Sequence, residues 1–418
     1  MKRIIAACLA LVMIFALASC AGGAGGGEAE GPLGVSEIII GYVGPITGPF
    51  AGLGLPIHEG ARWAIETINE NGGIMGVPIR YEFRDDQGDP TRSATYVREL
   101  VDRIGIHMLI GSPNSPSVSA VLDFLTENRI VTFLNSASAG ALVNHETYPY
   151  MFRTQVTNAI MAQGLIRDAQ RVGFERVVLL GDNGTVGTDG IAALREYAAL
   201  VGFEYLDVIQ YAPGTVDMTP VAQAVARNNP DAILSFSLGE DAARVVSALD
   251  RVGLTGTLSF LGYMGTFVPN FVDLVGEGPA QFVTYQAVNA MSVPDGMYPP
   301  HLGHAQVFYD RVQDELGPFG LGERDYDWFG MGRVYDVVQI MRHIIETAGS
   351  LDPGALRDAV HGITDFPSVI YETGYNFSPT NHEGFNPDWL ANCYLDRFII
   401  NEGYIRTEAV GVRTTRFD

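Results

Sequence analysis

The stretch Ile38-Ile39-Ile40-Gly41-Tyr42-Val43 sets the fold of this chain, because it predicts a β-branched strand that is apolar on both faces. Such a strand must be covered on both sides, which is typical of a parallel sheet between two layers of helices. Residues 58–71 follow with apolar side chains at helical spacing, and Gly72-Gly73 ends that helix. This order of elements predicts a βαβ unit.

The alternation of strand and helix continues, restarts at Arg176, and predicts a chain of two lobes. Asp89-Pro90 and Ser115-Pro116 match a helix start in which a cap residue precedes proline. The further strands are predicted at residues 79–84, 107–111, 130–134, 177–180, 205–211, 232–236 and 258–262, with helices at 188–201, 219–229 and 241–252. We therefore predict an α/β fold with two parallel sheets flanked by helices.

The last third of the chain is predicted to complete both lobes, so that the chain crosses between them more than once. A strand is predicted at 282–287, and helices are predicted at 305–316, 334–348 and 353–362. Two Tyr/Phe/Ile-rich segments between residues 369 and 405 surround the turn-rich stretch 378–387. This pattern predicts a β-hairpin or meander.

The N-terminus has the pattern of an export signal. Lys2 and Arg3 precede an apolar run over residues 4–18, which is too short for a membrane-spanning helix. The ending Leu17-Ala18-Ser19-Cys20 resembles the lipobox of bacterial lipoproteins, which implies that Cys20 becomes a lipid-bearing N-terminus. The alternative is an ordinary secretory signal. Gly, Ala and Glu dominate residues 21–36 and predict a flexible tether.

Charge and cysteine content narrow the possible partners. The chain of 418 residues has a net charge of −22, and removing Lys2 and Arg3 makes it −24. Such a chain repels nucleic acid and anionic lipid, so we expect no nucleic-acid partner and a soluble, monomeric body. Of three cysteines only Cys393 lies in the predicted folded part, so no intrachain disulfide is expected.

No motif for catalysis, a cofactor or a metal was found. No strand leads into a GxGxxG turn, Lys2 is the only lysine, and no GxSxG is present. His301 and His304 lie beside prolines and predict a surface loop rather than a metal site. We expect no enzyme; the alternative is an exported α/β enzyme that uses the loop at residues 181–190 for phosphate.

Small hydroxyl residues follow two of the predicted strands. Ser115 comes after the strand ending at Gly111, and Ser136 and Ser138 come after the strand ending at Leu134. Ligands of open parallel sheets bind at the carboxyl ends of strands, and serine hydroxyls beside amides of a helix start suit a carboxylate. The alternative is that Ser115 only caps a helix and the other two only form a loop.

The sequence resembles the branched-chain amino-acid type of type I periplasmic binding protein, the receptor of an ABC importer. The resemblance covers nearly the whole chain from about residue 38 and is most specific between Gly44 and Pro90. The matching residues are Gly44, Thr47-Gly48-Pro49, Gly54, Gly60-Ala61, Ala64, Ile68-Asn69, Gly72-Gly73-Ile74, Gly76, Asp85, Asp89-Pro90, Ile110-Gly111, Ser115, Ser136 to Ser138, Phe152-Arg153-Thr154, Gln163-Gly164 and Tyr335-Asp336.

The resemblance implies two Rossmann-like lobes joined by three hinge strands, with the ligand in the cleft between them. It implies a signal at 1–19, a tether at 20–36, a first lobe of 37–155 plus about 288–370, and a second lobe of 156–287 plus about 371–410. It further implies that Ser115, Ser136 and Ser138 hold the carboxylate of the ligand. The expected partners are an ABC permease and, through Cys20, the outer face of a bacterial membrane.

The remaining candidate site residues depart from the family's pattern. By resemblance, Met264 stands where an acid commonly pairs with the α-ammonium, and Asn158 stands where an aspartate is common. Leu53, Val186 and Leu238 stand where aromatic residues are common. Because a buried ammonium without a carboxylate partner is costly, we expect a carboxylate or amide with an apolar body and no ammonium.

Two questions stay open from the sequence alone. Asp241, Glu240 or Asp189 are alternative sources of the missing negative charge. The expected mechanism is closure of the lobes over the ligand, with no covalent step and no cofactor. A receptor of the same fold that signals to a partner instead of feeding a permease is the alternative function.

Overall fold

A computed structural model describes residues 32–48, 50–266, 271–287, 308, 314, 328–371, 374–384, 394–401 and 404–409. The predicted signal, Cys20, Cys393 and all of the predicted helix at 305–316 except residues 308 and 314 lie outside these residues. Within the described part of the chain, every helix is too short or too polar to span a membrane.

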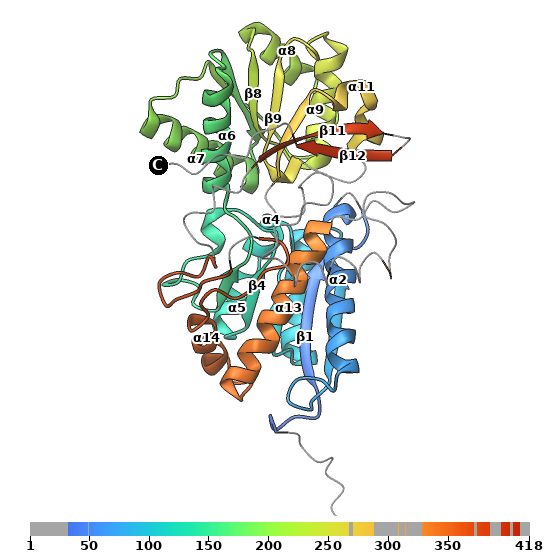
Figure 1. The fold of residues 1–418 in the computed structure, drawn as a ribbon, viewed down its shortest axis with the longest axis vertical. Coiled ribbons are helices and arrows are strands. Elements are labelled where there is room, and N and C mark those ends of the chain that lie inside the picture. The colour runs from blue at the N-terminus through green and yellow to red at the C-terminus, as the bar shows by residue number, and fades with distance from the viewer. Residues whose placement is uncertain are drawn as a thin grey trace, which may run out of the picture.

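Two sheets divide the chain into a first and a second lobe, stacked end to end (Figure 1). The sheet of the first lobe is parallel throughout, with the strand order β2-β1-β3-β4-β5. Its strands are β1 (Ile38–Gly44), β2 (Ile79–Asp85), β3 (Met108–Ile110), β4 (Val131–Leu134) and β5 (Met151–Arg153). The strands predicted around 38–43, 79–84, 107–111 and 130–134 are all present, and β5 was not predicted.

Helices cover both faces of the first sheet, as the apolar pattern of β1 predicted. Ile38 and Ile40 pack in one core cluster with residues of α2 and α13, whereas Ile39 packs in another with residues of α3 and α5. Figure 1 shows α2 and α13 side by side on one face. The helical elements of this lobe are α2 (Ala51–Glu70), α3 (Pro90–Glu99), η1 (Leu100–Ile104), α4 (Ser115–Ser119), α5 (Leu122–Glu127), η2 (Gly140–Leu142), α13 (Trp328–Ala348) and α14 (Pro353–His361).

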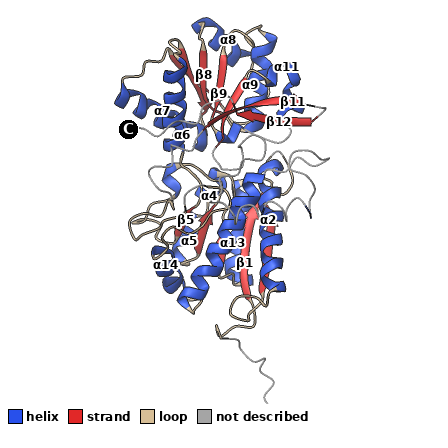
Figure 2. Cartoon of the chain, viewed as in Figure 1, coloured by secondary structure: helices blue, strands red, loops and turns tan. Residues whose placement is uncertain are grey.

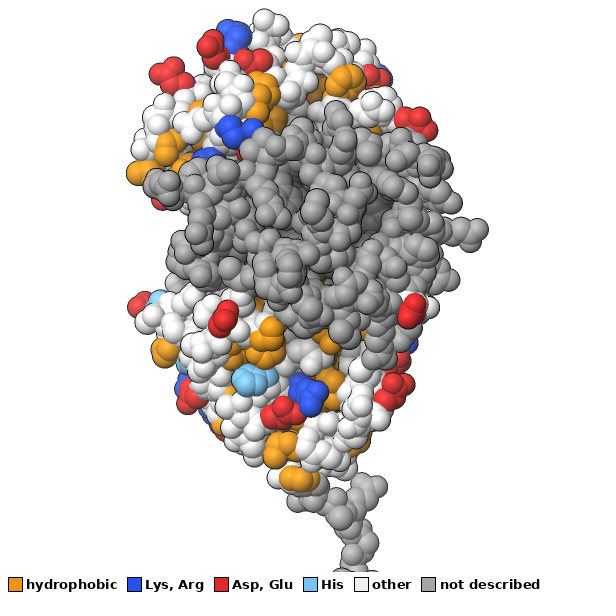
Figure 3. All heavy atoms as spheres, viewed as in Figure 1, with side chains coloured by type: hydrophobic (Ala, Val, Ile, Leu, Met, Phe, Trp, Pro, Cys, Tyr) orange, Lys and Arg blue, Asp and Glu red, His pale blue; other side chains and the backbone are white. Residues whose placement is uncertain are grey.

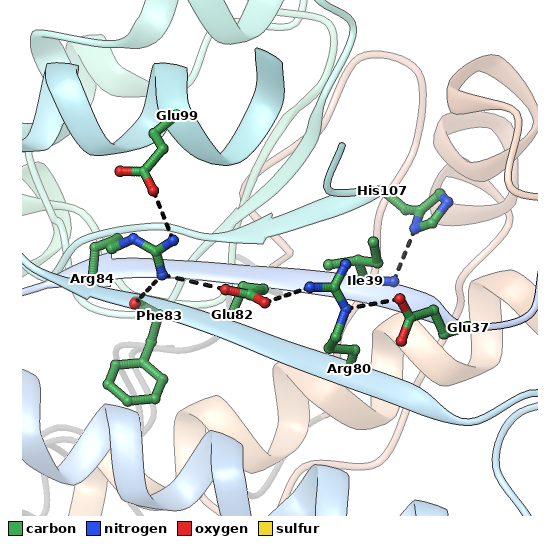
Figure 4. Close-up of polar contacts among 8 residues, drawn as sticks. All are labelled: Glu37, Ile39, Arg80, Glu82, Phe83, Arg84, Glu99 and His107. Atoms are coloured by element: carbon green, nitrogen blue, oxygen red, sulfur yellow. Dashed lines mark hydrogen bonds and ion pairs between the residues drawn. The ribbon is translucent and has the colours of Figure 1, made fainter. Parts of the chain in front are cut away.

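Charged side chains line the outer edge of the first sheet on strand β2 (Figure 4). Arg80 pairs with Glu37 at 2.9 Å and with Glu82, and Arg84 pairs with Glu99 at 2.9 Å. An edge strand that presents a row of ion pairs is a poor template for a strand from another chain. This edge is consistent with the monomer expected from the sequence.

The sheet of the second lobe is mixed, with the order β12-β11-β10-β9-β8-β6-β7. The strands from β6 to β10 pair in parallel, whereas β11 and β12 form an antiparallel hairpin beside β10. Its strands are β6 (Val177–Asp182), β7 (Asp207–Tyr211), β8 (Ala232–Phe236), β9 (Ser259–Gly262), β10 (Val283–Ala287), β11 (Tyr394–Asn401) and β12 (Tyr404–Ala409). The strands from β6 to β10 form the predicted parallel sheet, and a hairpin of the tail, β11 and β12, extends it at one edge.

Helices also flank the second sheet (Figure 2). They are α6 (Asn158–Val172), α7 (Thr185–Val201), α8 (Thr219–Asn228), α9 (Gly239–Arg251), η3 (Met264–Thr266), α10 (Phe271–Val275) and α11 (Glu277–Ala280). Helix α6 was not predicted; Thr157 caps it by accepting a hydrogen bond from the Ile160 amide. The two-lobed α/β fold predicted from the sequence is confirmed.

The long helix α2 begins at Ala51, seven residues earlier than predicted, and contains Pro56. Tertiary contacts hold this glycine- and proline-containing first part in place. The Tyr42 hydroxyl donates to the Gly54 carbonyl at 3.0 Å, and a Cβ on Gly54 would lie 2.0 Å from the Pro45 carbonyl oxygen. Packing that only glycine permits therefore overrides its low helix propensity.

The sequence predicts that the chain returns to the second lobe near residue 371, but the structure keeps it on the first lobe beyond that residue. The buried Asp336 of α13 accepts hydrogen bonds from the Ser368 hydroxyl, the Val369 amide and the Tyr375 hydroxyl at 2.6, 2.9 and 3.0 Å. Burial raises the pKa of Asp336 to about 7. Residues 374–384 thus stay on the first lobe, and the tail hairpin forms beyond them instead of around 378–387.

Candidate ligand-binding site

A cavity of about 410 Å³ lies between the two lobes, at the carboxyl ends of the strands. Both lobes contribute to its wall, through the loops after β3, β4, β6, β8 and β9 and through α2 and α13. The lining residues are Phe50, Leu53, Gly88, Pro113, Asn114, Ser115, Pro116, Ser136, Ser138, Gln155, Met161, Asp182, Gly184, Thr185, Val186, Pro213, Gly214, Leu238, Glu240, Asp241, Arg244, Tyr263, Met264, Gly265 and Arg333. Among them are seven of the eight predicted ligand-binding residues.

The loop after β4 brings two of the predicted serines to the cavity. Ser136 and Ser138 both line it. Arg153, fully buried in β5, donates from Nη1 to the Ser138 carbonyl at 3.0 Å and from Nη2 to the Ala139 carbonyl at 2.7 Å. Its Nε lies 3.4 Å from the Glu383 carboxylate, which balances the buried charge. Arg153 therefore fixes the loop on which these serines lie.

Ser115 joins the same group from the first turn of α4. Its Oγ accepts a hydrogen bond from the Ala139 amide at 3.4 Å, which ties α4 to the loop after β4. The alternative of Ser115 as the helix cap is wrong, because Asn114 occupies the cap position. The three serines thus converge on one wall of the cavity, although the sequence separates Ser115 from the others by about twenty residues.

Arg333 of α13 was not predicted, yet it lies on this wall. Its side chain is buried, with Nη2 3.1 Å from the Ser136 hydroxyl and Nη1 3.9 Å from the Met264 sulfur. A guanidinium held in an apolar surrounding is a strong partner for a carboxylate. In the sequence, Arg333 is an isolated arginine in an amphipathic helix, and nothing distinguishes it from a surface position.

The opposite wall, on the second lobe, is apolar with an acidic border. Val186, Leu238 and Met264 from the second lobe line the apolar part, and Leu53 from α2 of the first lobe also lines the cavity. Leu238 precedes the first residue of α9, and Met264 is in the short turn after β9. This wall can accommodate the hydrocarbon part of a small ligand.

The acidic border consists of Asp182, Glu240 and Asp241. Asp241 accepts from Arg244 Nη2 at 2.6 Å and from the Gly214 amide at 3.0 Å, and Glu240 lies 3.5 Å from Arg244. Asp182 accepts from the Gly184 amide at 2.7 Å, and burial raises the pKa of Asp182. These carboxylates therefore already have partners within the second lobe.

Asn158, the eighth predicted residue, does not line the cavity. It is fully buried in the first turn of α6, and its Nδ2 donates to Asp189 at 2.9 Å. Asp189 also accepts from the Gly140 amide at 3.2 Å and is likewise absent from the wall. The side chain of Asn158 points toward Asp189 of α7 within the second lobe, so the predicted ligand contact does not lie on the cavity wall; Asp189 in turn links this lobe to Gly140 of the first.

Two kinds of group were considered at the cavity: side chains that could hold a metal ion, and the predicted phosphate loop. Within the described residues, no three His, Cys, Asp or Glu side chains are grouped so as to hold a metal ion. The predicted loop at 181–190 is instead the end of β6, a two-residue connection and the start of α7, and the Asp182 carboxylate accepts from the Gly184 amide of that connection. An acid at that place would repel a phosphate.

Figure 3 shows acidic and basic side chains dispersed over the described surface of both lobes.

Two α/β lobes with a cavity between them define a bilobal solute-binding protein. A family model described as "Periplasmic binding protein" matches residues 37–393. The chain belongs to this family. Membership implies an extracytoplasmic location.

Known relatives and solved structures are similar to this chain over most of its length and of theirs. The Leu/Ile/Val-binding protein BraC3 of Rhizobium johnstonii is 26% identical over 356 residues, 82% of this chain and 89% of that protein. A Rhodopseudomonas palustris solute-binding protein in complex with 4-hydroxybenzoate aligns with a TM-score of 0.75 and 18% identity, over 90% and 96% of the two chains. The Streptococcus pneumoniae LivJ structure with isoleucine aligns with a TM-score of 0.74 and 18% identity, over 90% and 99%.

Proposed function

We propose that this chain captures a small carboxylate with an apolar body between its lobes and delivers it to an ABC permease. The observation that supports this most is the convergence of Ser115, Ser136, Ser138 and Arg333 on one wall of the cavity. Hydroxyl and guanidinium donors face the acid group there, and the apolar wall of the second lobe faces the hydrocarbon. A lipid on Cys20 would hold the protein at the outer face of the membrane.

Related structures bind both kinds of ligand that such a site could accept. The R. palustris protein was solved with 4-hydroxybenzoate, an acid that has no ammonium group, and S. pneumoniae LivJ was solved with isoleucine. A carboxylate is common to both. The proposal therefore rests on the serine hydroxyls and the guanidinium that line the first lobe's side of the cavity, as donors for a carboxylate.

Ligand capture proceeds by closure of the lobes. A ligand that contacts both walls stabilises the closed form over the open form, and the permease then distinguishes the closed pair of lobes. A dissociation constant near 1 μM corresponds to about 8 kcal/mol, which a few charge-assisted hydrogen bonds and an apolar wall can supply. No covalent step is needed.

The serine wall is tested by removing two hydroxyls at once. Ser115→Ala with Ser138→Ala should weaken carboxylate binding by about 100-fold, because each hydrogen bond to a charged group contributes about 1.5 kcal/mol or more. The ligand for calorimetry is first identified by mass spectrometry of small molecules released from the purified protein. The melting temperature of the ligand-free protein should barely change.

The matched control is Ser119→Ala, an exposed serine of the same short helix. It should leave the affinity unchanged. Unchanged affinity in the double variant would refute the assigned site. The lipid anchor is tested separately by labelling cells with a fatty acid; labelling of Cys20→Ala equal to that of the wild type would refute it.

A further inference from the structure

Gln155 lies in the passage between β5 and α6, alongside the loop after β4 that carries two of the serines. Just before it, the Thr154 amide donates to the Leu134 carbonyl at 3.0 Å. Further on, the Asn158 amide donates to the Ser138 carbonyl, also at 3.0 Å. Gln155 is 3% exposed and lines the cavity. Its side chain therefore belongs to the same wall as the serines.

Two hydrogen bonds fix the orientation of the Gln155 amide. Its Oε1 accepts from the Val156 amide at 3.1 Å and from the Tyr371 hydroxyl at 3.3 Å. A backbone N–H can only donate, so the atom that faces it is the oxygen and the amide cannot be turned over. Both lone pairs of Oε1 are thereby occupied. Because Nε2 has no acceptor among the described residues, what Gln155 offers to the cavity is an N–H donor.

Two serines of this wall also accept from the protein. The Ser115 hydroxyl accepts from the Ala139 amide at 3.4 Å, and the Ser136 hydroxyl accepts from Arg333 Nη2 at 3.1 Å. Each serine therefore keeps its O–H as a donor. A serine oxygen can still accept a second hydrogen bond, whereas the Nε2 of Gln155 can accept none. Gln155 is thus the member of this group that can only donate.

From this arrangement we infer that Gln155 is a specificity-determining residue, through which the site prefers a carboxylate to the carboxamide of the same shape. This inference rests on the proposed function and deepens it. A carboxylate has acceptors on both oxygens, but a carboxamide must turn its NH₂ toward one of the donors of the wall. Two donors that face each other in a buried site both stay unpaired, which costs more than a hydrogen bond exposed to water.

Pairs of an acid and its amide test this preference. The probes are 4-methylpentanoate with 4-methylpentanamide, 4-hydroxybenzoate with 4-hydroxybenzamide, and L-leucine with L-leucinamide. Each is titrated calorimetrically at neutral pH into the protein after removal of copurified ligand. Any acid that mass spectrometry finds among the released molecules forms a further pair with its amide. The wild type should bind the acid of at least one pair about 30-fold or more tightly than its amide.

Gln155→Glu connects the preference to this residue. The glutamate keeps one oxygen for the Val156 amide and the Tyr371 hydroxyl, and it places an acceptor where Nε2 now lies. Binding of the acid should weaken by about 100-fold, because two carboxylates then face each other. Binding of the amide should become about three-fold or more tighter, because its NH₂ gains an acceptor.

Two further variants complete the test. Gln155→Met removes the donor without adding a charge; it should weaken binding of the acid by about ten-fold and of the amide by less. Gln170→Glu, the same substitution at an exposed position of α6, is the control and should change neither affinity. A merely structural role of Gln155 would weaken acid and amide alike in Gln155→Glu, and added negative charge alone would not improve binding of the amide.

The outcomes distinguish this inference from the function on which it rests. Tighter binding of the amides than of the acids by the wild type, or no gain in amide affinity in Gln155→Glu, overturns the role of Gln155 and leaves a carboxylate receptor in place. If no acid binds, and none is found among molecules released from the purified protein, the proposed receptor fails together with the inference.

Discussion

The two walls of the cavity use charge in opposite ways. On the first lobe, hydroxyls and the guanidinium of Arg333 face the cavity, and Arg153 braces the loop from behind. On the second lobe, an arginine and two carboxylates of α9 pair with one another at the rim around an apolar centre. Under the proposed function, this difference assigns recognition of the acid group to the first lobe and selection of the shape of the remainder to the apolar wall.

The largest expected effect comes from replacing Arg153, which holds the serine loop of the first wall in place. Arg153→Met deletes both hydrogen bonds to the serine loop and leaves the Glu383 carboxylate buried without its cation. We expect a loss of about 3–5 kcal/mol in the free energy of unfolding, measured with urea. Arg153→Met with Glu383→Gln should lose less than the single variant. Equal losses would mean that the ion pair is not the source of the cost.

Lowering the pH from about 6.5 to 4 should lower the stability of the first lobe through His382. This ring stacks on Phe152, its Nδ1 lies 3.0 Å from the Met151 carbonyl, and its Nε2 lies 2.9 Å from His361. Burial, with smaller contributions from His361, His145 and Arg357, lowers the pKa of His382 from 6.5 to about 4. The unfolded chain therefore binds the proton first, and stability falls as the pH drops from about 6.5 to 4, by about 3 kcal/mol.

His382→Asn tests this by the slope of unfolding free energy against pH. The variant should start less stable at pH 7.5, because it loses the stacking on Phe152, and should lose about 2–3 kcal/mol less than the wild type on going to pH 4. His343→Asn, at an exposed histidine of α13, is the control and should keep the wild-type slope. A wild-type slope in His382→Asn would contradict the assignment.

Raising the pH from about 4 to 8 should lower the stability of the second lobe through Asp168. This buried carboxylate of α6 lies 3.5 Å from Arg171, and burial raises its pKa from 3.8 to about 6. The folded chain binds the proton more tightly, so this contribution is complete below about pH 4 and is lost as the pH rises through 6. Asp168→Asn should therefore be more stable than the wild type at pH 8 by about 2 kcal/mol and equal to it near pH 4.

The control for Asp168 is Glu196→Gln, at an exposed acid of the adjoining helix α7. It should follow the wild type at both pH values. If Asp168→Asn were no more stable than the wild type at pH 8, the buried carboxylate would not be the group that titrates.

The smallest effect is expected from replacing Arg244 beside the acidic border of the second wall. Arg244→Met removes the cation that Glu240 and Asp241 share and leaves their negative charge beside the cavity. We expect affinity for a carboxylate to fall by about ten-fold, or about 1.4 kcal/mol, and to fall further at low salt. Arg251→Met, exposed at the end of the same helix, is the control in the same titration. A gain in affinity would show that the acid group binds elsewhere.

The sequence was informative wherever a local pattern determines a local structure. The β-branched runs gave nearly all strands, and Asp89 and Asp352 cap their helices by accepting from amides of the first turn, as expected from the prolines after them. Three serines that follow predicted strands line the same cavity, because the carboxyl ends of parallel strands meet at one edge of a sheet.

What the sequence missed depends on contacts between distant segments. Arg333 bonds to Ser136 across 197 residues, and no spacing rule connects an arginine in a late helix to a loop that distant. Asn158 was misassigned because its partner, Asp189, lies a whole strand and part of two helices further on. The segment from Ser368 to Tyr375 stays on the first lobe because it bonds to one buried carboxylate, Asp336, which lies more than thirty residues earlier.

Helix α13 connects the cavity to the passage between the two lobes. Arg333 and Asp336 are one turn apart on it; the first reaches the cavity, and the second anchors the segment at Ser368. From that segment the Tyr371 hydroxyl donates to Gln155, which lines the cavity at the passage between β5 and α6. Hydrogen bonds therefore connect Arg333 at the cavity, through α13 and the segment at 368–371, to Gln155 at the passage between the lobes.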